Sequence, residues 1–372
     1  MKTVVVSSAP LIQKADGWYA YSPYVQELEL WAKYATTVTM VCPVWSDTKG
    51  TLVARLSFSP ERVIFLHEFN IKTLQGVLRA LFFLIPNLWK LYRAMQRAEH
   101  IHLRCPGNLS LLGCVVQSLF PKTYKTCKYA GNWDPQAAQP IAYRWQKKLL
   151  SHTRFTQNMR VLVYGEWPRA SKNIVPFFTA SYFYSEILPV PDRWERRPWH
   201  VVFVGTLGAN KRPMYVVQLV AKLRERGVPM TLALYGHGAE YDRITQFIQE
   251  QNLSEWIVCY GNQPREVIQQ ALCDAHFLCL PSQSEGWPKA VAEAMFWGAI
   301  PWATSVSCVP QMLNEGRRGL ILTLDINRDI KHIQQGCADP NALRQQSQQA
   351  MEWSRQYTLD AFEIAIRKLM QP

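Results

Sequence analysis

Short runs of β-branched and apolar residues alternate along the chain with longer stretches in which apolar residues recur three or four positions apart. A compact apolar run predicts a strand, and the wider spacing predicts a helix with one buried face. In the first half of the chain, strands are predicted at Thr3–Ser8, Val38–Val44, Arg62–His67, His100–Arg104, Thr126–Ala130 and Val161–Tyr164. In the second half, they are predicted at Val201–Gly205, Thr231–Gly236, Ile257–Gly261, His276–Pro281, Ala299–Ala303 and Gly319–Thr323. This alternation predicts an α/β protein whose parallel sheets carry helices on both faces.

A chain of 372 residues is long enough for two such domains. The segment Leu188–His200 carries three prolines and has neither strand nor helix periodicity, which predicts an interdomain linker. We therefore expect an N-terminal domain over residues 1–187 and a C-terminal domain from residue 201, both Rossmann-like and facing a central cleft. In sheets of this kind, ligands bind beyond the carboxyl ends of the strands, where the connecting loops lie.

The composition favours packed cores, because hydrophobic residues make up 48% of the chain and charged residues only 19%. The net charge of +13 is uneven. Residues 1–187 hold 22 Lys and Arg against 10 Asp and Glu, a charge of +12, whereas the remainder is nearly neutral. A basic first domain favours a phosphorylated substrate, an anionic membrane surface or nucleic acid as its partner, or it is a solvated face without one.

The nine cysteines are scattered, and none forms a Cys-x-x-Cys motif. They predict small buried side chains in a reducing compartment, and neither a disulfide framework nor a zinc site. The N-terminus has too short an apolar run for a signal peptide and is interpreted as the first strand. We therefore expect a cytoplasmic protein, and the basic first domain favours attachment to the inner face of the cell membrane.

The segment Lys72–Ala98 combines a long apolar run with Arg79, Lys90, Arg93 and Arg97. Its apolar run is interrupted and is shorter than the roughly 20 residues of a spanning helix. Two interpretations stay open: an amphipathic helix lying on an anionic bilayer, or a pair of helices packed within the first domain. The charge of the domain slightly favours the membrane. Nucleic acid is not expected, because the aromatic residues follow helical spacing and form no stacking platform.

The strongest local motif follows the predicted strand that ends at Pro281. A short loop carries Ser284 and Glu285, and a helix that begins near Pro288 carries Glu293 and stops at Gly298. Proline suits the first turn of a helix, whose N–H groups and dipole favour an anion such as a diphosphate. The two carboxylates are then placed to bind sugar hydroxyls. The alternative is that both glutamates are surface charges of the helix.

The pattern Pro-Ser-x-Ser-Glu-Gly-Trp-Pro-x-x-x-x-Glu-Ala-Met-x-x-Gly resembles the donor-site signature of the family 4 retaining glycosyltransferases, which have the GT-B fold. The resemblance extends over the second half of the chain. Three further segments match the family's glycine-containing loops in order: Phe203–Arg212, Tyr235–Glu240 and Cys259–Pro264. The first half matches only in layout and in the loop around Gly17.

This resemblance implies a role for each matching residue. Glu285 would bind hydroxyls of the donor sugar, Glu293 those of the ribose, and Lys211 with Arg212 would neutralise the diphosphate as it leaves. Further donor-binding positions implied by the motifs are Gly17, Gly205, Gly236, Gly261, Ser284, and Trp287 and Lys289 through their backbone N–H groups. No Asp-x-Asp motif is present, so we expect neither a metal nor a cofactor besides the nucleoside-diphosphate sugar. The resemblance also implies that residues 201–355 bind this donor, and that a last helix over 356–372 returns to the N-terminal domain.

The chain departs from the family at two positions. Thr206 stands where an arginine usually follows the phosphate-loop glycine, so Arg212 or Lys289 replaces that charge, or donor binding is weaker. Arg104 stands nearest the place of a histidine beside the sugar, while His102 lies earlier in the strand. We therefore assign Arg104 to the catalytic site.

The acceptor site is less well marked. Asn132 and Asp134 follow a predicted strand at the same edge of the first sheet, where they would contact the acceptor; equally, Asn and Asp before a proline form turns. The leading hypothesis is transfer of a hexose, with retention, to a glycan or lipid-linked acceptor of cell-surface polysaccharide synthesis. The alternatives are a GT-B nucleotide-sugar epimerase, for which no acid–base pair is identified, a transferase-like protein that only binds its donor, and a non-catalytic basic module that binds membrane or nucleic acid.

Overall fold

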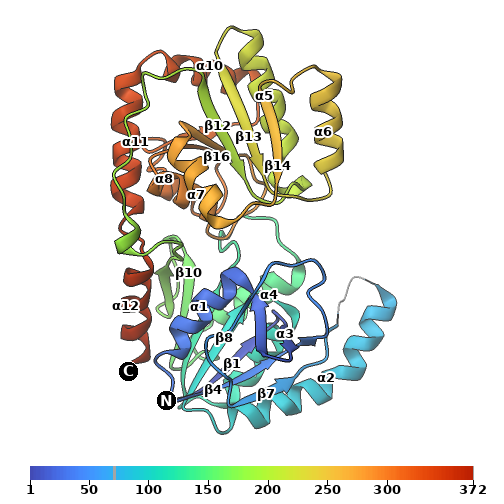
Figure 1. Cartoon of the computed structure of the whole chain (residues 1–372). Helices are drawn as coiled ribbons and strands as arrows, with labels where there is room; N and C mark the ends of the chain where they lie inside the picture. Colours follow the sequence, from blue (N-terminus) through green and yellow to red (C-terminus); the bar gives the residue numbers. More distant parts are fainter. Residues whose placement is uncertain (70–72, 372) are drawn as a thin grey trace. The chain divides into compact units, whose positions relative to one another are not determined.

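The computed structural model describes residues 1–69 and 73–371. They form two compact units: Met1–Phe177 together with the chain from Glu363 onward, and Phe178–Phe362 (Figure 1). Lys72 of the segment Lys72–Ala98 lies outside the described residues.

The first unit is built on a parallel sheet of seven strands in the order β11-β10-β9-β8-β1-β4-β7. The strands are β1 (Lys2–Ser7), β4 (Thr37–Cys42), β7 (Arg62–Phe65), β8 (His100–Cys105), β9 (Tyr124–Tyr129), β10 (Met159–Tyr164) and β11 (Ile174–Phe177). All but β11 were predicted within a few residues, and Pro176 inside β11 obscures its strand pattern.

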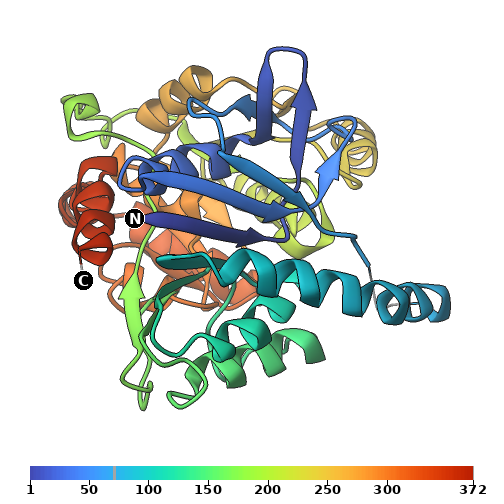
Figure 2. The same ribbon diagram turned by 90° about the horizontal axis from the view of Figure 1, so that it is seen from below.

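Helices cover both faces of this sheet (Figure 2). In β1, Val4 and Val6 pack with residues of three helices, whereas Val5 points to the other face and packs with α1. The helices of the unit are α1 (Ser22–Ala32), α2 (Leu74–Met95), α3 (Asn108–Val116), the short 3₁₀ turn η1 (Gln117–Leu119) and α4 (Ile141–Ser151). The face with α2, α3 and α4 is thus separate from the face with α1.

A small second sheet was not predicted. It has the order β5-β2-β3-β6, and its strands are β2 (Leu11–Lys14), β3 (Gly17–Tyr21), β5 (Val44–Trp45) and β6 (Val53–Arg55). These strands are two to five residues long and partly exposed, so they lack the apolar run by which a strand is recognised.

The second unit is built on a parallel sheet of six strands in the order β14-β13-β12-β15-β16-β17. These are β12 (Trp199–Val204), β13 (Met230–Tyr235), β14 (Ile257–Gly261), β15 (Phe277–Leu280), β16 (Ile300–Thr304) and β17 (Leu320–Leu322). All six agree with the predicted strands to within two residues. With the sheet of the first unit, they confirm the predicted α/β class with two Rossmann-like domains.

The helices of the second unit form two groups. α5 packs on α6 and α10, while α8 packs on α7 and α11. Their bounds are α5 (Pro213–Glu225), α6 (Tyr241–Glu250), α7 (Arg265–Asp274), α8 (Lys289–Phe296), α9 (Val309–Met312), α10 (Ile326–Cys337) and α11 (Pro340–Ser354), with short 3₁₀ turns η2 (Tyr184–Glu186) and η3 (Ala209–Lys211). Aspartates fix two helix starts, because Asp325 and Asp339 each accept backbone N–H bonds at the beginning of α10 and α11.

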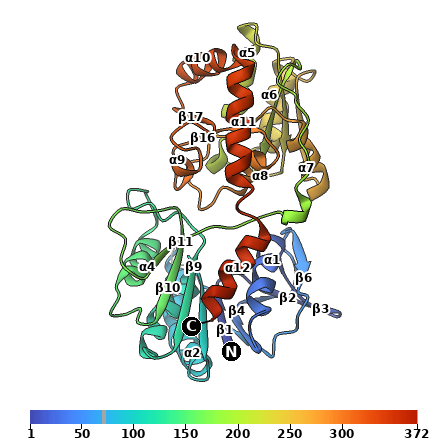
Figure 3. The ribbon, with the colours of Figure 1, turned by 90° about the vertical axis from the view of Figure 1, so that its left-hand side faces the viewer.

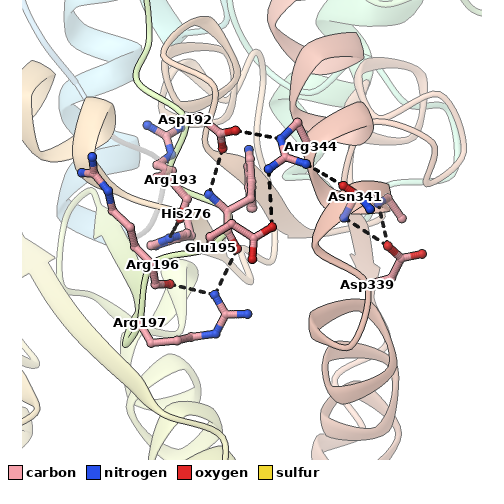
Figure 4. Close-up of polar contacts among 11 residues, drawn as sticks. Asp192, Arg193, Glu195, Arg196, Arg197, His276, Asp339, Asn341 and Arg344 are labelled. Carbon is pink, nitrogen blue, oxygen red and sulfur yellow. Dashed lines mark hydrogen bonds and ion pairs between the residues drawn. The ribbon is translucent and has the colours of Figure 1, made fainter.

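The segment 188–200, expected as a linker, is packed into the second unit (Figure 4). Arg193 is buried and donates to the carbonyl oxygen of Trp297 at 3.0 Å, and its own carbonyl oxygen lies 2.8 Å from Nε2 of His276. Arg344 of α11 binds the carboxylates of Asp192 and Glu195 at 2.9 and 3.5 Å. Proline removes the regular periodicity here. Arg193, Trp194 and Trp199 are buried, whereas most other side chains of the segment are exposed.

The last helix, α12 (Leu359–Met370), begins in the second unit and ends in the first (Figure 3). Beyond Phe362 it lies beside α1, where Tyr34 donates to the carboxylate of Glu363 at 2.6 Å and Lys33 forms an ion pair with the same carboxylate.

The segment from Thr73 onward forms one continuous helix, α2, with Pro86 inside it and Thr73 capping its start. Within residues 1–69 and 73–371, no helix is long and apolar enough to cross a membrane. All nine cysteines are free thiols, and six of them are buried.

Candidate functional site

Three glycines lie side by side at the carboxyl ends of β12, β13 and β14. Gly205, Gly236 and Gly261 all have positive φ, at 154°, 135° and 68°. A Cβ on Gly236 would lie only 1.9 Å from the carbonyl oxygen of Gly205, so the two backbones meet where a side chain has no room. The N–H of Gly236 donates to the carbonyl oxygen of Gly261 at 2.8 Å. The glycines of the three motifs therefore let three loops pack backbone to backbone at one edge of the sheet.

The loop after β12 turns sharply before α5. Leu207 is fully buried beneath it, and the turn ends at Arg212, which adopts the left-handed conformation with φ 49°. The guanidinium of Arg212 donates to the carbonyl oxygen of Pro281 at 3.0 Å. This contact ties the loop after β12 to the loop after β15, which the pairing of the two strands already brings close.

A short ladder joins these two loops. The N–H of Gln283 donates to the carbonyl oxygen of Asn210 at 2.7 Å, and the side-chain amide of Asn210 donates to the carbonyl oxygen of Ser284 at 3.2 Å. On the far side, the end of β16 and the loop after it hold the same segment. Thr304 donates to the carbonyl oxygen of Ser282 at 2.5 Å and Ser307 to that of Gly286 at 2.8 Å. The loop that carries Glu285 is thus fixed from two neighbouring strands.

Lys211 and Glu285 form an ion pair across these two loops. The side chain of Lys211 is 24% exposed and that of Glu285 is 10% exposed, so the pair is largely shielded but reachable from solvent. The sequence separation is 74 residues, and the parallel pairing of β12 with β15 brings the two groups together. An ammonium held beside a carboxylate at a loop edge provides one group for phosphate oxygens and one for hydroxyls.

Glu293 lies in α8, which starts at Lys289 with Pro288 as the preceding residue and ends before Gly298. Its carboxylate accepts a hydrogen bond from the hydroxyl of Ser181 at 2.5 Å. Ser181 belongs to the same unit but comes 112 residues earlier. Glu293 is therefore held in one orientation by Ser181, which no sequence motif had marked.

Trp287 is predicted to act through its backbone, and its side chain has a packing role. The indole stacks on Trp353 of α11 at 6.1 Å and contacts Tyr357 edge-on at 5.4 Å between ring centroids. This packing fixes the start of α8, where Lys289 is the first helical residue.

In the first unit, Arg104 is bound within a cluster of charges at the end of β8. Its guanidinium lies 2.9 Å from one oxygen of Glu27 in α1, and Lys128 of β9 lies 3.0 Å from the other oxygen. Burial alone would raise the pKa of the Glu27 carboxyl. The positive charges of Lys128 and Arg104 together have a larger, opposite effect and lower this pKa to about 2. The side chain of Arg104 is 21% exposed, and its guanidinium carbon lies 4.2 Å from the ring centroid of Tyr24.

His102, earlier in the same strand, is buried. Its ring centroid lies 4.2 Å from that of Trp31, so His102 is a packed core residue.

The other predicted residues of the first unit lie in turns. Gly17 has φ 142° at the tip of the hairpin between β2 and β3. The side-chain oxygen of Asn132 accepts the N–H of Asp134 at 2.8 Å, and the side-chain oxygen of Asp134 accepts the N–H of Gln136 at 2.8 Å. These bonds are the Asx turns expected before a proline, and they occupy an oxygen on each side chain.

The comparisons with known proteins agree with this architecture. Residues 188–353 match the family model described as glycosyl transferases group 1. The lipopolysaccharide 1,6-galactosyltransferase of Escherichia coli (strain K12) is 30% identical over 125 residues, which are 33% of this chain and 33% of that protein. The match thus spans about a third of the length of this curated relative.

Two solved structures match nearly the whole chain. A sucrose-phosphate synthase from Thermosynechococcus elongatus has a TM-score of 0.66 at 19% identity and covers 99% of this chain and 98% of its own. The Anabaena protein Alr3699/HepE, solved in complex with UDP and glucose, also has a TM-score of 0.66, at 13% identity with 99% and 98% covered. At such low identity the likeness concerns the fold.

The fold and the loops define a protein of the GT-B class, with two Rossmann-like domains. Within this fold, residues 188–353 of the second unit are similar to the glycosyl transferases group 1 family.

Proposed function

We propose that this protein is a retaining glycosyltransferase that moves a hexose from a nucleoside-diphosphate sugar to a glycan or lipid-linked acceptor. The observation that carries the proposal is the Lys211–Glu285 pair, held between two loops at the carboxyl edge of a parallel sheet. The family match covers the domain in which this pair lies.

The donor would bind along this edge in a defined order. Lys211 and Arg212, in the loop after β12, would neutralise the charge that develops on the diphosphate as the bond between the sugar and the diphosphate breaks. Glu285 would accept hydrogen bonds from hydroxyls of the transferred sugar, and Glu293, oriented by Ser181, from the ribose. Thr206 supplies no charge, so Lys211 carries most of the leaving-group stabilisation in this proposal.

The acceptor and pathway are proposed from the relatives. A lipopolysaccharide galactosyltransferase is among them, and so is a putative colanic acid biosynthesis glycosyltransferase of Escherichia coli, 25% identical over 140 residues. Both names concern bacterial surface polysaccharides. We propose a related acceptor for this protein, at the cytoplasmic face of the membrane, with Asn132 and Asp134 binding the acceptor and Arg104 in the catalytic site.

The test is the substitution Glu285→Ala, with transfer and donor hydrolysis measured against a panel of UDP-, GDP- and ADP-sugars. We expect the variant to fold, as judged by circular dichroism and thermal unfolding, and to lose nearly all of both activities. A folded variant with the activity of the original protein would overturn the assignment.

Retention and independence of metal are tested separately. The product of the first minutes of reaction, examined by NMR, should have the anomeric configuration of the donor. Activity should survive an excess of EDTA, because Lys211 and Arg212 are proposed to stabilise the leaving group. An inverted product would contradict the retaining assignment, and loss of activity that Mg²⁺ restores would contradict the metal-free one.

A further inference from the structure

Helix α2 exposes a broad apolar stripe. Leu74, Leu78, Phe82, Ile85 and Trp89 are 79%, 60%, 75%, 75% and 62% exposed. Their spacing of three or four residues places them along one side of the helix. Isolated exposed apolar residues are common on soluble proteins, whereas a continuous row of this length marks a contact surface.

The same helix packs on its own domain only weakly at its start. In the part of α2 before Pro86, only Gly76 is buried. The part of α2 after Pro86 has four buried residues: Asn87, Leu91, Ala94 and Met95. Accordingly, the start of α2 extends beyond the edge of the seven-stranded sheet (Figures 1 and 2). The apolar stripe therefore lies on the part of the helix that contributes least to the core.

The charged residues in and around α2 are mostly basic. The helices α2, α3 and α4 contain no Asp or Glu, and the whole range 73–158 holds twelve Lys and Arg but only Glu99 and Asp134 as acids. Arg79 and Arg93 of α2 are exposed, and the guanidinium of Arg93 lies 5.7 Å from the ring of Trp89. A second helix on the same face of the sheet repeats the pattern, because Ile141 and Trp145 of α4 are 63% and 57% exposed.

We propose that the face formed by α2, α3 and α4 docks on an anionic lipid bilayer, with the stripe of α2 inserted at the depth of the headgroups. An apolar stripe flanked by basic residues and an exposed tryptophan has the chemistry of an interfacial helix. A second copy of this chain would place like charges against each other, which argues against self-association through this face. The inference deepens the proposed function by placing a lipid-linked acceptor and the enzyme at one surface.

The first experiment measures sedimentation of the full chain with vesicles. We expect strong binding to phosphatidylcholine vesicles that contain about a third phosphatidylglycerol, weak binding to phosphatidylcholine alone, and a loss of binding as salt is raised. Equal partition to both vesicles would overturn the proposal. The assay needs neither donor nor acceptor, so its outcome is independent of whether the protein is a transferase.

Two matched pairs of variants locate the contact. The double substitution F82S/I85S should weaken vesicle binding by about tenfold or more, whereas L52S/Y184S, at positions 66% and 71% exposed on other elements, should not. R79E/R93E should weaken binding to anionic vesicles by at least about tenfold, and R243E/R317E, with the same change of net charge, should have a much smaller effect.

All four variants should keep the thermal unfolding of the original protein, because the replaced side chains are exposed. Binding by F82S/I85S equal to that of its control would overturn the proposal. The proposal would also be overturned if light scattering showed a dimer of the original protein that F82S/I85S abolishes, because the stripe would then serve self-association.

Discussion

At the scale of single residues, the candidate site depends on pairs that the fold brings together. Lys211 and Glu285 neutralise each other across two loops, and Glu293 takes its orientation from Ser181. Each group is functional in the proposal because a partner positions it. A charged side chain held in this way needs no reorganisation when the donor binds.

We expect Lys211→Met to lower kcat by about a hundredfold to a thousandfold, the effect of removing one preorganised group that stabilises developing charge. Arg212→Met should have a smaller effect, because its guanidinium already donates to the carbonyl oxygen of Pro281. Steady-state kinetics on the two folded variants make the comparison. An equal loss in both would mean that Lys211 has no special role at the diphosphate.

The charge cluster of the first unit predicts a pH dependence of stability. The pKa of Glu27 is lowered from 4.5 to about 2, so its contribution is present above pH 4.5 and is lost as the pH falls towards 2. Glu27→Gln should destabilise the protein by about 3 kcal/mol at neutral pH, because it leaves Lys128 and Arg104 without the carboxylate that both contact.

Urea unfolding at several pH values is the measurement for this cluster. The difference between Glu27→Gln and the original protein should shrink as the pH drops below 4.5. A difference that stays constant down to acid pH would contradict the assigned pKa.

At the scale of elements, the glycine motifs determine how loops pack. The family resemblance implied donor binding by these loops, and the structure gives a packing reason for the glycines, since the backbone of Gly205 occupies the place of a Cβ on Gly236. Short strands without an apolar run, such as β2, β3 and β6, gave no such signal and were missed.

We therefore expect Gly236→Ala to destabilise the second unit by about 2 kcal/mol or more, because two backbones must separate and φ is 135°. Gly336→Ala is the matched control. Nothing lies within 4 Å of a Cβ at this position of α10, so alanine should stabilise the helix by about 0.5–1 kcal/mol. Thermal unfolding of the two variants should shift in opposite directions. A Gly236→Ala variant as stable as the original protein would contradict the backbone packing.

At the scale of the whole molecule, each unit has its own sheet and core, and the motifs proposed to bind the donor lie in the second, apart from the loop around Gly17. A nucleotide that binds the native second unit stabilises it in proportion to the logarithm of its concentration. At about a hundred times its Kd the gain is about 2.7 kcal/mol, which corresponds to a rise in Tm of about 5–10 °C for a unit of this size.

Thermal unfolding with UDP, GDP and ADP at equal concentrations should therefore identify the base through the one nucleotide that raises Tm. Glu293→Ala should reduce this shift if the carboxylate binds the ribose. A shift of the same size for all three nucleotides, unchanged in the variant, would place the nucleotide elsewhere.

The sequence by itself determined the alternation of strands and helices, twelve of the main-sheet strands, the loops that carry Lys211 and Glu285, and the helix that carries Glu293. These follow from local patterns, because apolar periodicity and glycine positions are properties of neighbouring residues. The tertiary structure alone decided which groups meet: Ser181 with Glu293, and Glu27 with Arg104 and Lys128. It also decided that Arg193, Trp194 and Trp199 of the segment 188–200 are buried and that the apolar side of α2 is exposed. Such contacts join residues far apart in the chain, and burial depends on what the rest of the fold covers.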